Sequence, residues 1–363
     1  MATTKNRTGN YFEDFHLGMT IRHATPRTLT EADRSLYIGL TGSRAALGTA
    51  QTNAHALGFE QRPLEDLLVF NTAFGKTVPD ISLNAVANLG YADVRFVADV
   101  YPGDTLSVET TIIGTKENSN RKSGVVYVRS SASNQHGREV LTWIRWVMVH
   151  KRNFEARCSE PVVPSLEAVV ASARLPRADY LAGVRDIVTM TGIEALWDDY
   201  EVGERIDHPG AMTVNDSDHS IATRLYQNTA KAHFDGYAAA AQGKQRLVYG
   251  GHVMSICKAL TYDGLENALS FLAINSGSHV NPTHAGDTLA CATQVLEKID
   301  LGDGSPVGGL RVRTIGVKNA SPVSIVFADA TGQRPTHPEH VVLDLDYTVA
   351  IPRLPGLQRQ STT

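Results

Sequence analysis

The chain contains two copies of one sequence pattern, and this duplication limits what it can fold into. Residues 11–23 reappear in outline as residues 196–208, with Gly18 matching Gly203 at a distance of 185 residues. Such a repeat predicts a duplicated domain, and a length of 363 residues is typical of about two domains. We expect an N-terminal domain over residues 1–160, a linker over 161–190 and a C-terminal domain over 191–363.

Each copy begins with a helix and continues with strands. Thr30 and Asn215 are N-cap candidates, and each is followed three residues later by an acid, Asp33 or Asp218. This spacing predicts two helix starts, so both acids are better explained as capping residues than as catalytic ones. Gly-Asp turns then precede segments of alternating polarity in both copies. The order predicts an α+β fold with antiparallel strands.

The segment between the copies breaks the correspondence. Pro161 and Pro164 begin an extended linker, and residues 165–174 predict a helix that bridges the two halves, with Val169 and Val170 on its packed side.

Composition excludes several classes of function. A formal net charge of −4 gives no electrostatic footprint for nucleic acid or for anionic membranes. No apolar segment reaches the ~18 residues of a membrane span, and the N-terminus has no secretory pattern. The three cysteines show no metal-ligand spacing, which indicates reduced thiols in a cytoplasmic protein, with Cys257 as core filler on a helix.

The strongest candidate site is the polar stretch of residues 223–235, which is followed by the pair Gly250-Gly251 at a helix start. The stretch gathers Asn228, Lys231, His233 and Asp235. Proton-transfer groups beside free N–H donors of a helix are what polarising a thioester carbonyl requires. The alternative is a polar turn with a surface histidine.

One helix per copy, four or five strands and a Pro-Gly-Asp-Thr-Leu turn resemble the hot-dog fold, in which a long helix is wrapped by an antiparallel sheet. The duplication resembles the double hot-dog arrangement of the (R)-specific enoyl-CoA hydratases. Their motif runs Gly-Asp-x-Asn-Pro-x-His-x-Asp. The second copy keeps its last two members as His233 and Asp235, but has Asn228 at the catalytic Asp position and Lys231 at the Pro position.

Within that superfamily, longer runs are similar to the mesaconyl-CoA hydratases, also called β-methylmalyl-CoA dehydratases or 2-methylfumaryl-CoA hydratases. These runs are residues 66–70, 74–92, 222–234 and 249–253. The resemblance implies reversible addition of water to mesaconyl-CoA, giving (2R,3S)-β-methylmalyl-CoA, in glyoxylate assimilation. It implies no metal and no redox cofactor, because coenzyme A enters only as part of the acyl-CoA substrate.

The resemblance also implies roles for single residues. The Gly251 amide would stabilise negative charge on the thioester oxygen, although close packing alone would also require a glycine there. His233 would orient or deprotonate the water and relay its proton, unless it is a structural histidine. Asn228 cannot act as a base and would only position the water. Asp235 is a possible acid–base partner, with a surface position as the alternative.

The acyl group of such a substrate carries a free carboxylate, which calls for a cation. Arg224 and Lys231 are the nearest cations in sequence, and arginine is the better bidentate partner. Tyr249 and His252 are candidates to hydrogen-bond the acyl group. The polar residues of an apolar segment in the first copy are expected to line the joint between the copies: Asn84, Asn88 and Tyr91.

The loop at residues 41–48 of the first copy lacks both the acid and the histidine. The second copy should therefore hold the chemistry, and the first should supply the acyl and pantetheine channel. Two other functions stay open: an acyl-CoA thioesterase, since the same fold hosts both, and a non-catalytic acyl-CoA binding protein. Each copy resembles one subunit of an ancestral dimer, and we expect two chains to form a homodimer.

Overall fold

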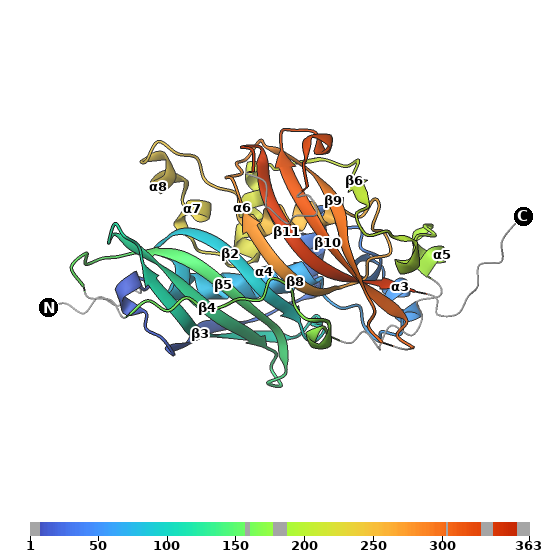
Figure 1. Ribbon diagram of the computed structural model, residues 1–363, viewed down its shortest axis with the longest axis horizontal. Coiled ribbons are helices and arrows are strands. Elements are labelled where there is room, and N and C mark those ends of the chain that lie inside the picture. The colour runs from blue at the N-terminus through green and yellow to red at the C-terminus, as the bar shows by residue number, and fades with distance from the viewer. Residues whose placement is uncertain (1–7, 157–159, 177–186, 303, 328–336, 354–363) are drawn as a thin grey trace, which may run out of the picture.

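The structure is a computed structural model that describes residues 8–156, 160–176, 187–302, 304–327 and 337–353. Its centre is one antiparallel sheet with the strand order β1-β3-β4-β5-β2-β8-β11-β10-β9-β6, and β7 pairs with β9 (Figure 1). The strands of the first copy are β1 (Thr20–Thr28), β2 (Ala85–Phe96), β3 (Thr105–Glu117), β4 (Ser123–Ser133) and β5 (Glu139–His150). Those of the second are β6 (Arg205–Asp207), β7 (Met212–Thr213), β8 (Phe271–His279), β9 (Thr288–Ile299), β10 (Val307–Lys318) and β11 (Val341–Pro352).

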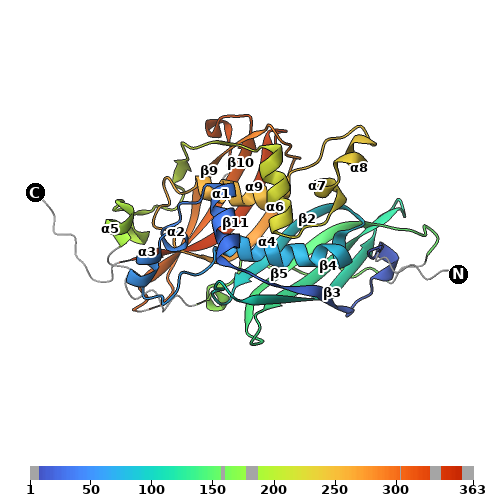
Figure 2. The same cartoon turned by 180° about the vertical axis from the view of Figure 1, so that it is seen from behind.

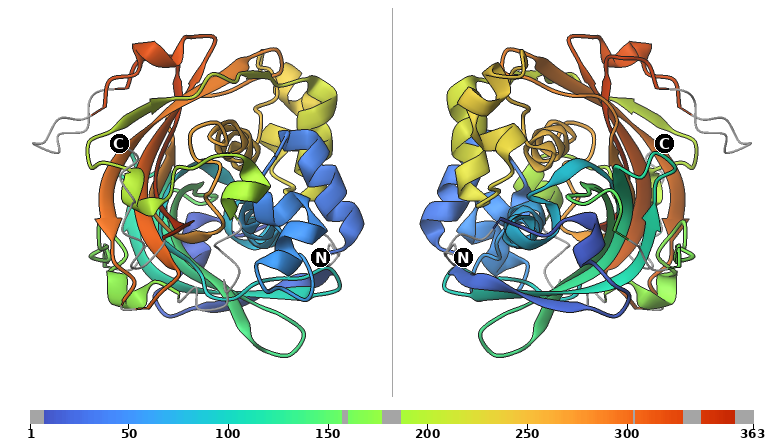
Figure 3. Two further views of the ribbon diagram at one scale, coloured as in Figure 1. Left: turned by 90° about the vertical axis from the view of Figure 1, so that its right-hand side faces the viewer. Right: turned by 90° about the vertical axis from the view of Figure 1, so that its left-hand side faces the viewer.

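The two halves of the sheet have the same internal order and meet at β2 and β8. Tyr91 lies opposite Gly277 in this pairing, and Arg95 lies opposite Ala273. The sheet curls around two central helices, one from each copy (Figure 3). The duplication and the α+β class predicted from the sequence are therefore confirmed, whereas the exact domain limits stay a prediction.

The helices cover the concave face of the sheet (Figure 2). The central helices are α4 (Asp66–Thr77) and α9 (Gly250–Leu260), and α1 (Glu31–Thr41) and α6 (Asp216–Leu225) lie beside them. Shorter helices are α2 (Ala46–Thr49), α3 (Gln51–Ala56), α5 (Ile187–Thr191), α7 (Lys231–Phe234) and α8 (Gly236–Ala240). No helix in the described part of the chain is long and apolar enough to cross a bilayer.

The repeated local signals begin a helix in each copy. Thr30 caps α1 in a capping box with Asp33, so Asp33 is a capping residue as predicted. Asn215 is the N-cap residue of α6 but forms no side-chain cap. The capping role predicted for Asp218 is wrong, because its carboxylate accepts hydrogen bonds from the side chains of Asn215 and Ser217.

The repeated histidines also hold equivalent places. Nε2 of His23 lies 2.7 Å from Oγ1 of Thr110, and Nε2 of His208 lies 2.7 Å from Oγ1 of Thr293. Both rings are buried, and their contacts are structural.

The helix predicted over residues 165–174 is wrong. This segment is extended, with a single 3-10 turn at Ser172–Arg174. Within it the N–H of Val170 donates to Oδ1 of Asn275 on β8 at 3.0 Å, and just before it Val162 pairs with Thr115 of β3. These tertiary hydrogen bonds outweigh a weak local helix preference.

Helix α4 lies at the centre of the core. Every residue of α4 after Asp66 is buried, which is typical of a helix enclosed on all sides. A Cβ added at Gly75 would lie 1.9 Å from the carbonyl oxygen of Tyr226, so the chain that leaves α6 packs directly on the α4 backbone. This close approach positions the loop of the candidate site.

We predict that Gly75→Ala destabilises the protein by at least about 1–3 kcal/mol, because the carbonyl oxygen it meets belongs to the backbone and cannot rotate away. Gly39→Ala is the matched control, since Gly39 also lies in a helix but has open space around its Cβ position. The control should leave stability unchanged or raise it by up to about 1 kcal/mol. Denaturant unfolding measures both, and equal effects would contradict the close contact.

Candidate functional site

Helix α9 begins at the glycine pair predicted from the sequence. Tyr249 is its N-cap residue in an extended conformation and forms no side-chain cap. Within the described chain, the N–H groups of Gly250 and Gly251 have no hydrogen-bond acceptor. Unpaired N–H groups at a helix N-terminus bind anions and developing negative charge.

Gly251 also has a packing role. A Cβ there would lie 2.0 Å from Oδ1 of Asn71 on α4. Nδ2 of Asn71 donates to the carbonyl oxygen of Gly251 and to Oγ of Ser255, each at 3.0 Å. The two central helices therefore cross at a distance that only glycine permits. Charge stabilisation by the Gly251 amide stays a prediction alongside this packing.

Gly250 lies against a histidine from the sheet. A Cβ at Gly250 would lie 2.5 Å from ring atoms of His279, the last residue of β8. The hydroxyl of Tyr91 is 2.7 Å from Nε2 of His279. Tyr91 thus lies at the joint between the copies, where the sequence placed it, and connects the joint to the start of α9.

His233 lies on α7, beside the same helix start. Its Nδ1 is 3.0 Å from the carbonyl oxygen of Leu247, so Nδ1 carries the hydrogen and Nε2 keeps a lone pair. The ring centroid is 5.6 Å from that of Tyr249. Burial lowers the pKa of His233 to about 4, and the nearby His219 contributes to the lowering. At neutral pH the ring is therefore uncharged and able to accept a proton.

Three further histidines around α9 are also held neutral. Burial lowers the pKa of His252 and of His279 to about 4 each, and it lowers the pKa of His219. The ring nitrogens of His252 and His219 are buried without a hydrogen-bond partner. The described residues include no group of histidine, cysteine, aspartate or glutamate side chains arranged to hold a metal ion.

Asn228 shapes the loop between α6 and α7. It is buried, and its Oδ1 accepts a hydrogen bond from the N–H of Ala230 at 3.0 Å while its own N–H donates to the carbonyl oxygen of Thr223. This bond from Oδ1 to the second residue along is an Asx turn, which asparagine supports as well as aspartate does.

Several other predicted site residues have contacts of a structural kind. Asp235 caps α8, since its Oδ1 accepts a hydrogen bond from the N–H of Ala238 at 2.9 Å. Arg224 and Lys231 are both exposed, and Nε of Arg224 donates to the carbonyl oxygen of Ser220 on its own helix.

The predicted place of Asn84 at the joint between the copies is wrong. Its Nδ2 donates to the carbonyl oxygens of Thr8 and Asn10, so it fastens the N-terminal segment beside the start of β2. Asn88 pairs with Val147 of β5, and its Oδ1 is buried without a partner.

A surface groove of about 300 Å³ runs beside residues 224–234 of the candidate site. Its walls come from α4, from the turn after α4 and from residues 224–234. Lys76 and Arg224 supply two cations, and Nζ of Lys76 donates to Oε1 of Gln227 at 2.9 Å. Thr229 and Phe234, which lie on either side of His233 in the sequence, also line the groove.

Comparison with known proteins places this geometry in a family. A family model described as mesaconyl-CoA hydratase matches residues 1–165. The chain is 48% identical over 353 residues to the β-methylmalyl-CoA dehydratase of Chloroflexus aurantiacus, covering 97% of this chain and 99% of that protein. The chain belongs to the mesaconyl-CoA hydratase family. A mesaconyl-CoA hydratase from Cereibacter sphaeroides is 46% identical, covering 96% of this chain and all of that protein.

Solved structures show the fold of the family. A putative MaoC domain dehydratase from Chloroflexus aurantiacus superimposes with a TM-score of 0.90 at 48% identity, over 97% of this chain and 100% of that one. A Mycobacterium tuberculosis protein described as a double hotdog superimposes with a TM-score of 0.76 at 24% identity, over 95% of this chain and 99% of that one. The double hot-dog fold predicted from the sequence is confirmed.

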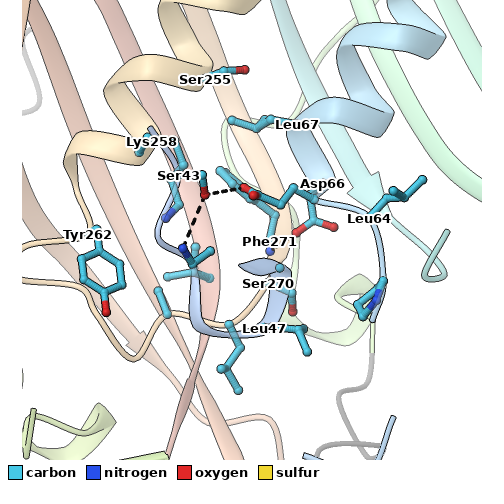
Figure 4. Close-up of a pocket in the computed structure, with 18 of the residues that line it drawn as sticks. Ser43, Leu47, Leu64, Asp66, Leu67, Ser255, Lys258, Tyr262, Ser270 and Phe271 are labelled. Atoms are coloured by element: carbon cyan, nitrogen blue, oxygen red, sulfur yellow. Dashed lines mark hydrogen bonds between the residues drawn. The ribbon is translucent and has the colours of Figure 1, made fainter. Parts of the chain in front are cut away.

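The first half of the chain has different residues at the position equivalent to the candidate site. Glu65 and Asp66 stand 185 residues before Gly250 and Gly251, at the start of α4. The cavity beside them measures about 60 Å³, which is room for only a few water molecules (Figure 4). Ser43 stands in the place of Asn228 and donates to Oε2 of Glu65 at 2.9 Å. Carboxylates at this helix start oppose any stabilisation of a developing anion.

Sequence reasoning missed three residues that the fold brings to α9 or to its neighbour α4. Asn71 of the first copy contacts Gly251, and His279 of the second copy contacts Gly250 and Tyr91. Arg145 lies on β5 behind α4. Only Arg145 left a local signal, as the one cation within the otherwise uncharged strand of residues 141–149. The contacts of the other two depend on pairing between copies.

The two carboxylates at the start of α4 predict a pH-dependent stability. Burial raises the pKa of Asp66 to about 7 and that of Glu65 to about 6. A carboxyl whose pKa is raised on folding binds a proton more tightly in the folded state. Stability is therefore present at low pH and is lost as the pH rises from about 4 to about 7.

We predict that Asp66→Asn raises the melting temperature by at least about 2 °C at pH 8 and by less at pH 5. The amide oxygen can still accept the hydrogen bond that Oδ2 of Asp66 receives from the N–H of Phe271 at 2.7 Å. The exposed Asp198→Asn serves as control and should give the same small change at both pH values. Scanning calorimetry checks this, and an Asp66→Asn effect that is larger at pH 5 would contradict the buried carboxylate.

Proposed function

We propose that this chain catalyses the reversible addition of water to mesaconyl-CoA, giving β-methylmalyl-CoA. The observation that carries the proposal is the identity of 46–48% with a mesaconyl-CoA hydratase and a β-methylmalyl-CoA dehydratase over nearly the whole chain. The site geometry supports it, since a neutral histidine lies beside a helix N-terminus with unpaired N–H groups.

The reaction needs acid–base and electrostatic help only. The water oxygen bonds to the β-carbon, one of its protons leaves, and the α-carbon takes up a proton. Negative charge passes through the thioester oxygen on the way, which N–H donors stabilise. No electrons are exchanged with a second reactant. The proposed mechanism therefore uses no metal and no redox cofactor, and coenzyme A takes part only within the substrate.

The second copy would carry these steps. Nε2 of His233 is the proposed acceptor of the water proton, because Nδ1 is engaged by Leu247 and the ring is neutral. The Gly251 amide is the proposed donor to the thioester oxygen. Asn228 holds the loop in shape, and Asp235 caps α8, so neither is needed as the base in this scheme.

We propose that the enzyme works in the cytoplasm. Cys257 and Cys291 are buried free thiols, which accords with a reducing compartment. Cys158 lies outside the described residues. We also propose that two chains assemble as a homodimer, and the mass of the particle in solution tests this.

We predict that His233→Ala lowers kcat for mesaconyl-CoA hydration by about 10²–10⁴-fold, because the proton acceptor is removed. The control is His55→Ala, an exposed histidine on α3 at the other end of the molecule from α7 (Figure 1). Loss of absorbance at the conjugated double bond measures hydration, and a thiol reagent detects free CoA. Release of CoA by the native protein would favour a thioesterase. An unchanged rate in His233→Ala would remove His233 from the mechanism.

The pH dependence of kcat/KM tests the state of His233. An ordinary histidine would lose activity near pH 6.5. Since the pKa of His233 is about 4, we predict that the rate stays level between pH 5.5 and 7.5 and falls only below about pH 5, where Nε2 becomes protonated. Circular dichroism at each pH confirms that the protein is folded. A half-maximal rate near pH 6.5 in folded protein would contradict the buried neutral ring.

A further inference from the structure

Arg145 is a buried cation without a counter-ion. It lies on β5 with no exposed surface, and its guanidinium carbon is 4.3 Å from the ring centroid of Phe74. Its Nη2 reaches Oγ of Ser82 at 3.5 Å, while Nε and Nη1 are buried without an acceptor. Among the described residues, no carboxylate forms an ion pair with it. The equally buried Arg34 differs, because its Nη1 donates to Oε1 of Glu31 at 2.7 Å.

Such a position is unfavourable in the free protein. Burial lowers the pKa of Arg145 to about 10, which still leaves the guanidinium charged at neutral pH. A buried charge with unused donors lacks the solvation it would have in water, and an arriving anion restores the missing partner. The guanidinium also presents its donors in a fixed fork that fits a carboxylate in bidentate fashion.

Arg145 is connected to the candidate site from two sides. On β2 the residue directly opposite is Tyr91, whose hydroxyl contacts His279. His279 ends β8 and lies against Gly250 at the start of α9. Through Phe74 it is next to Tyr249, since these ring centroids are 6.3 Å apart, and Tyr249 in turn neighbours His233. The cation therefore lies on the sheet side of the place where water would be added.

The substrate class supplies the anion that fits. In the mesaconyl group, the free carboxylate is bonded directly to the carbon that takes the hydroxyl, so its binding site must lie close to the proton acceptor. We propose that Arg145 binds this carboxylate and selects dicarboxylic over neutral enoyl-CoA substrates. The inference rests on the proposed function, because it assigns the acyl end of the same site.

The other nearby cations fit this role less well. Arg224 and Lys231, the candidates from the sequence, are exposed, where water competes for the carboxylate. Lys76 is buried, but its Nζ already donates to Gln227. Arg145 combines full burial, unused donors and a place behind the reaction site.

The test compares Arg145→Met with the matched variant Arg224→Met on two substrates, mesaconyl-CoA and the neutral crotonyl-CoA. For Arg145→Met, kcat/KM for mesaconyl-CoA should fall by at least about 10²-fold, while that for crotonyl-CoA changes by less than about threefold. Arg224→Met should leave the ratio between the two substrates unchanged. An equal loss on both substrates in folded Arg145→Met, or a selective loss in Arg224→Met, would overturn the assignment.

Two additions keep the test decisive. If the native protein does not hydrate mesaconyl-CoA, the proposed function itself fails, whatever the variants do. If Arg145→Met does not fold, or if crotonyl-CoA is not hydrated, calorimetric binding of two unreactive ligands replaces the rates. The native protein should bind succinyl-CoA at least about tenfold more tightly than butyryl-CoA, and Arg145→Lys should reduce that ratio. Equal binding of both ligands by the native protein, or an unchanged ratio in Arg145→Lys, would overturn the proposal.

Discussion

The crossing of α4 and α9 is the contact on which the rest of the structure depends. Asn71 of the first copy hydrogen-bonds the Gly251 carbonyl and the Ser255 hydroxyl of the second, at a separation that leaves no room for a Cβ. The same α4 receives the loop after α6 at Gly75. One helix of the first copy therefore positions both the start of α9 and the loop of His233. The first copy therefore helps to build the candidate site.

The same arrangement explains how two related halves come to differ. Each half offers a helix start beneath a loop, but one has glycines and the other has Glu65 and Asp66. Glycines leave the helix N–H groups open to a ligand, whereas carboxylates bring negative charge to the same place. Burial makes those carboxylates harder to ionise. This difference supports the proposal that the second copy carries the chemistry.

Local signals in the sequence were enough to predict the repeats, the cap at Thr30, the start of α6 after Asn215 and the glycine start of α9. Predictions from the sequence failed where contacts between distant segments determine the local structure. The linker is extended because the sheet supplies hydrogen-bond partners to Val162 and Val170. His279 reaches the site only through the pairing of β2 with β8, which no local pattern reveals. Sequence reasoning locates elements well, but the inward-facing residues of paired strands depend on tertiary structure.

A single physical property, exclusion of water, accounts for the unusual charges around α9. It keeps four histidines neutral, so that one of them can accept a proton at physiological pH. It also strengthens the interaction of helix N–H groups with developing charge, because fewer water dipoles screen them. In the same surroundings an unpaired guanidinium such as Arg145 is unfavourable until an anion arrives. Burial therefore accounts both for the neutral histidine and for the unfavourable position of the unpaired guanidinium.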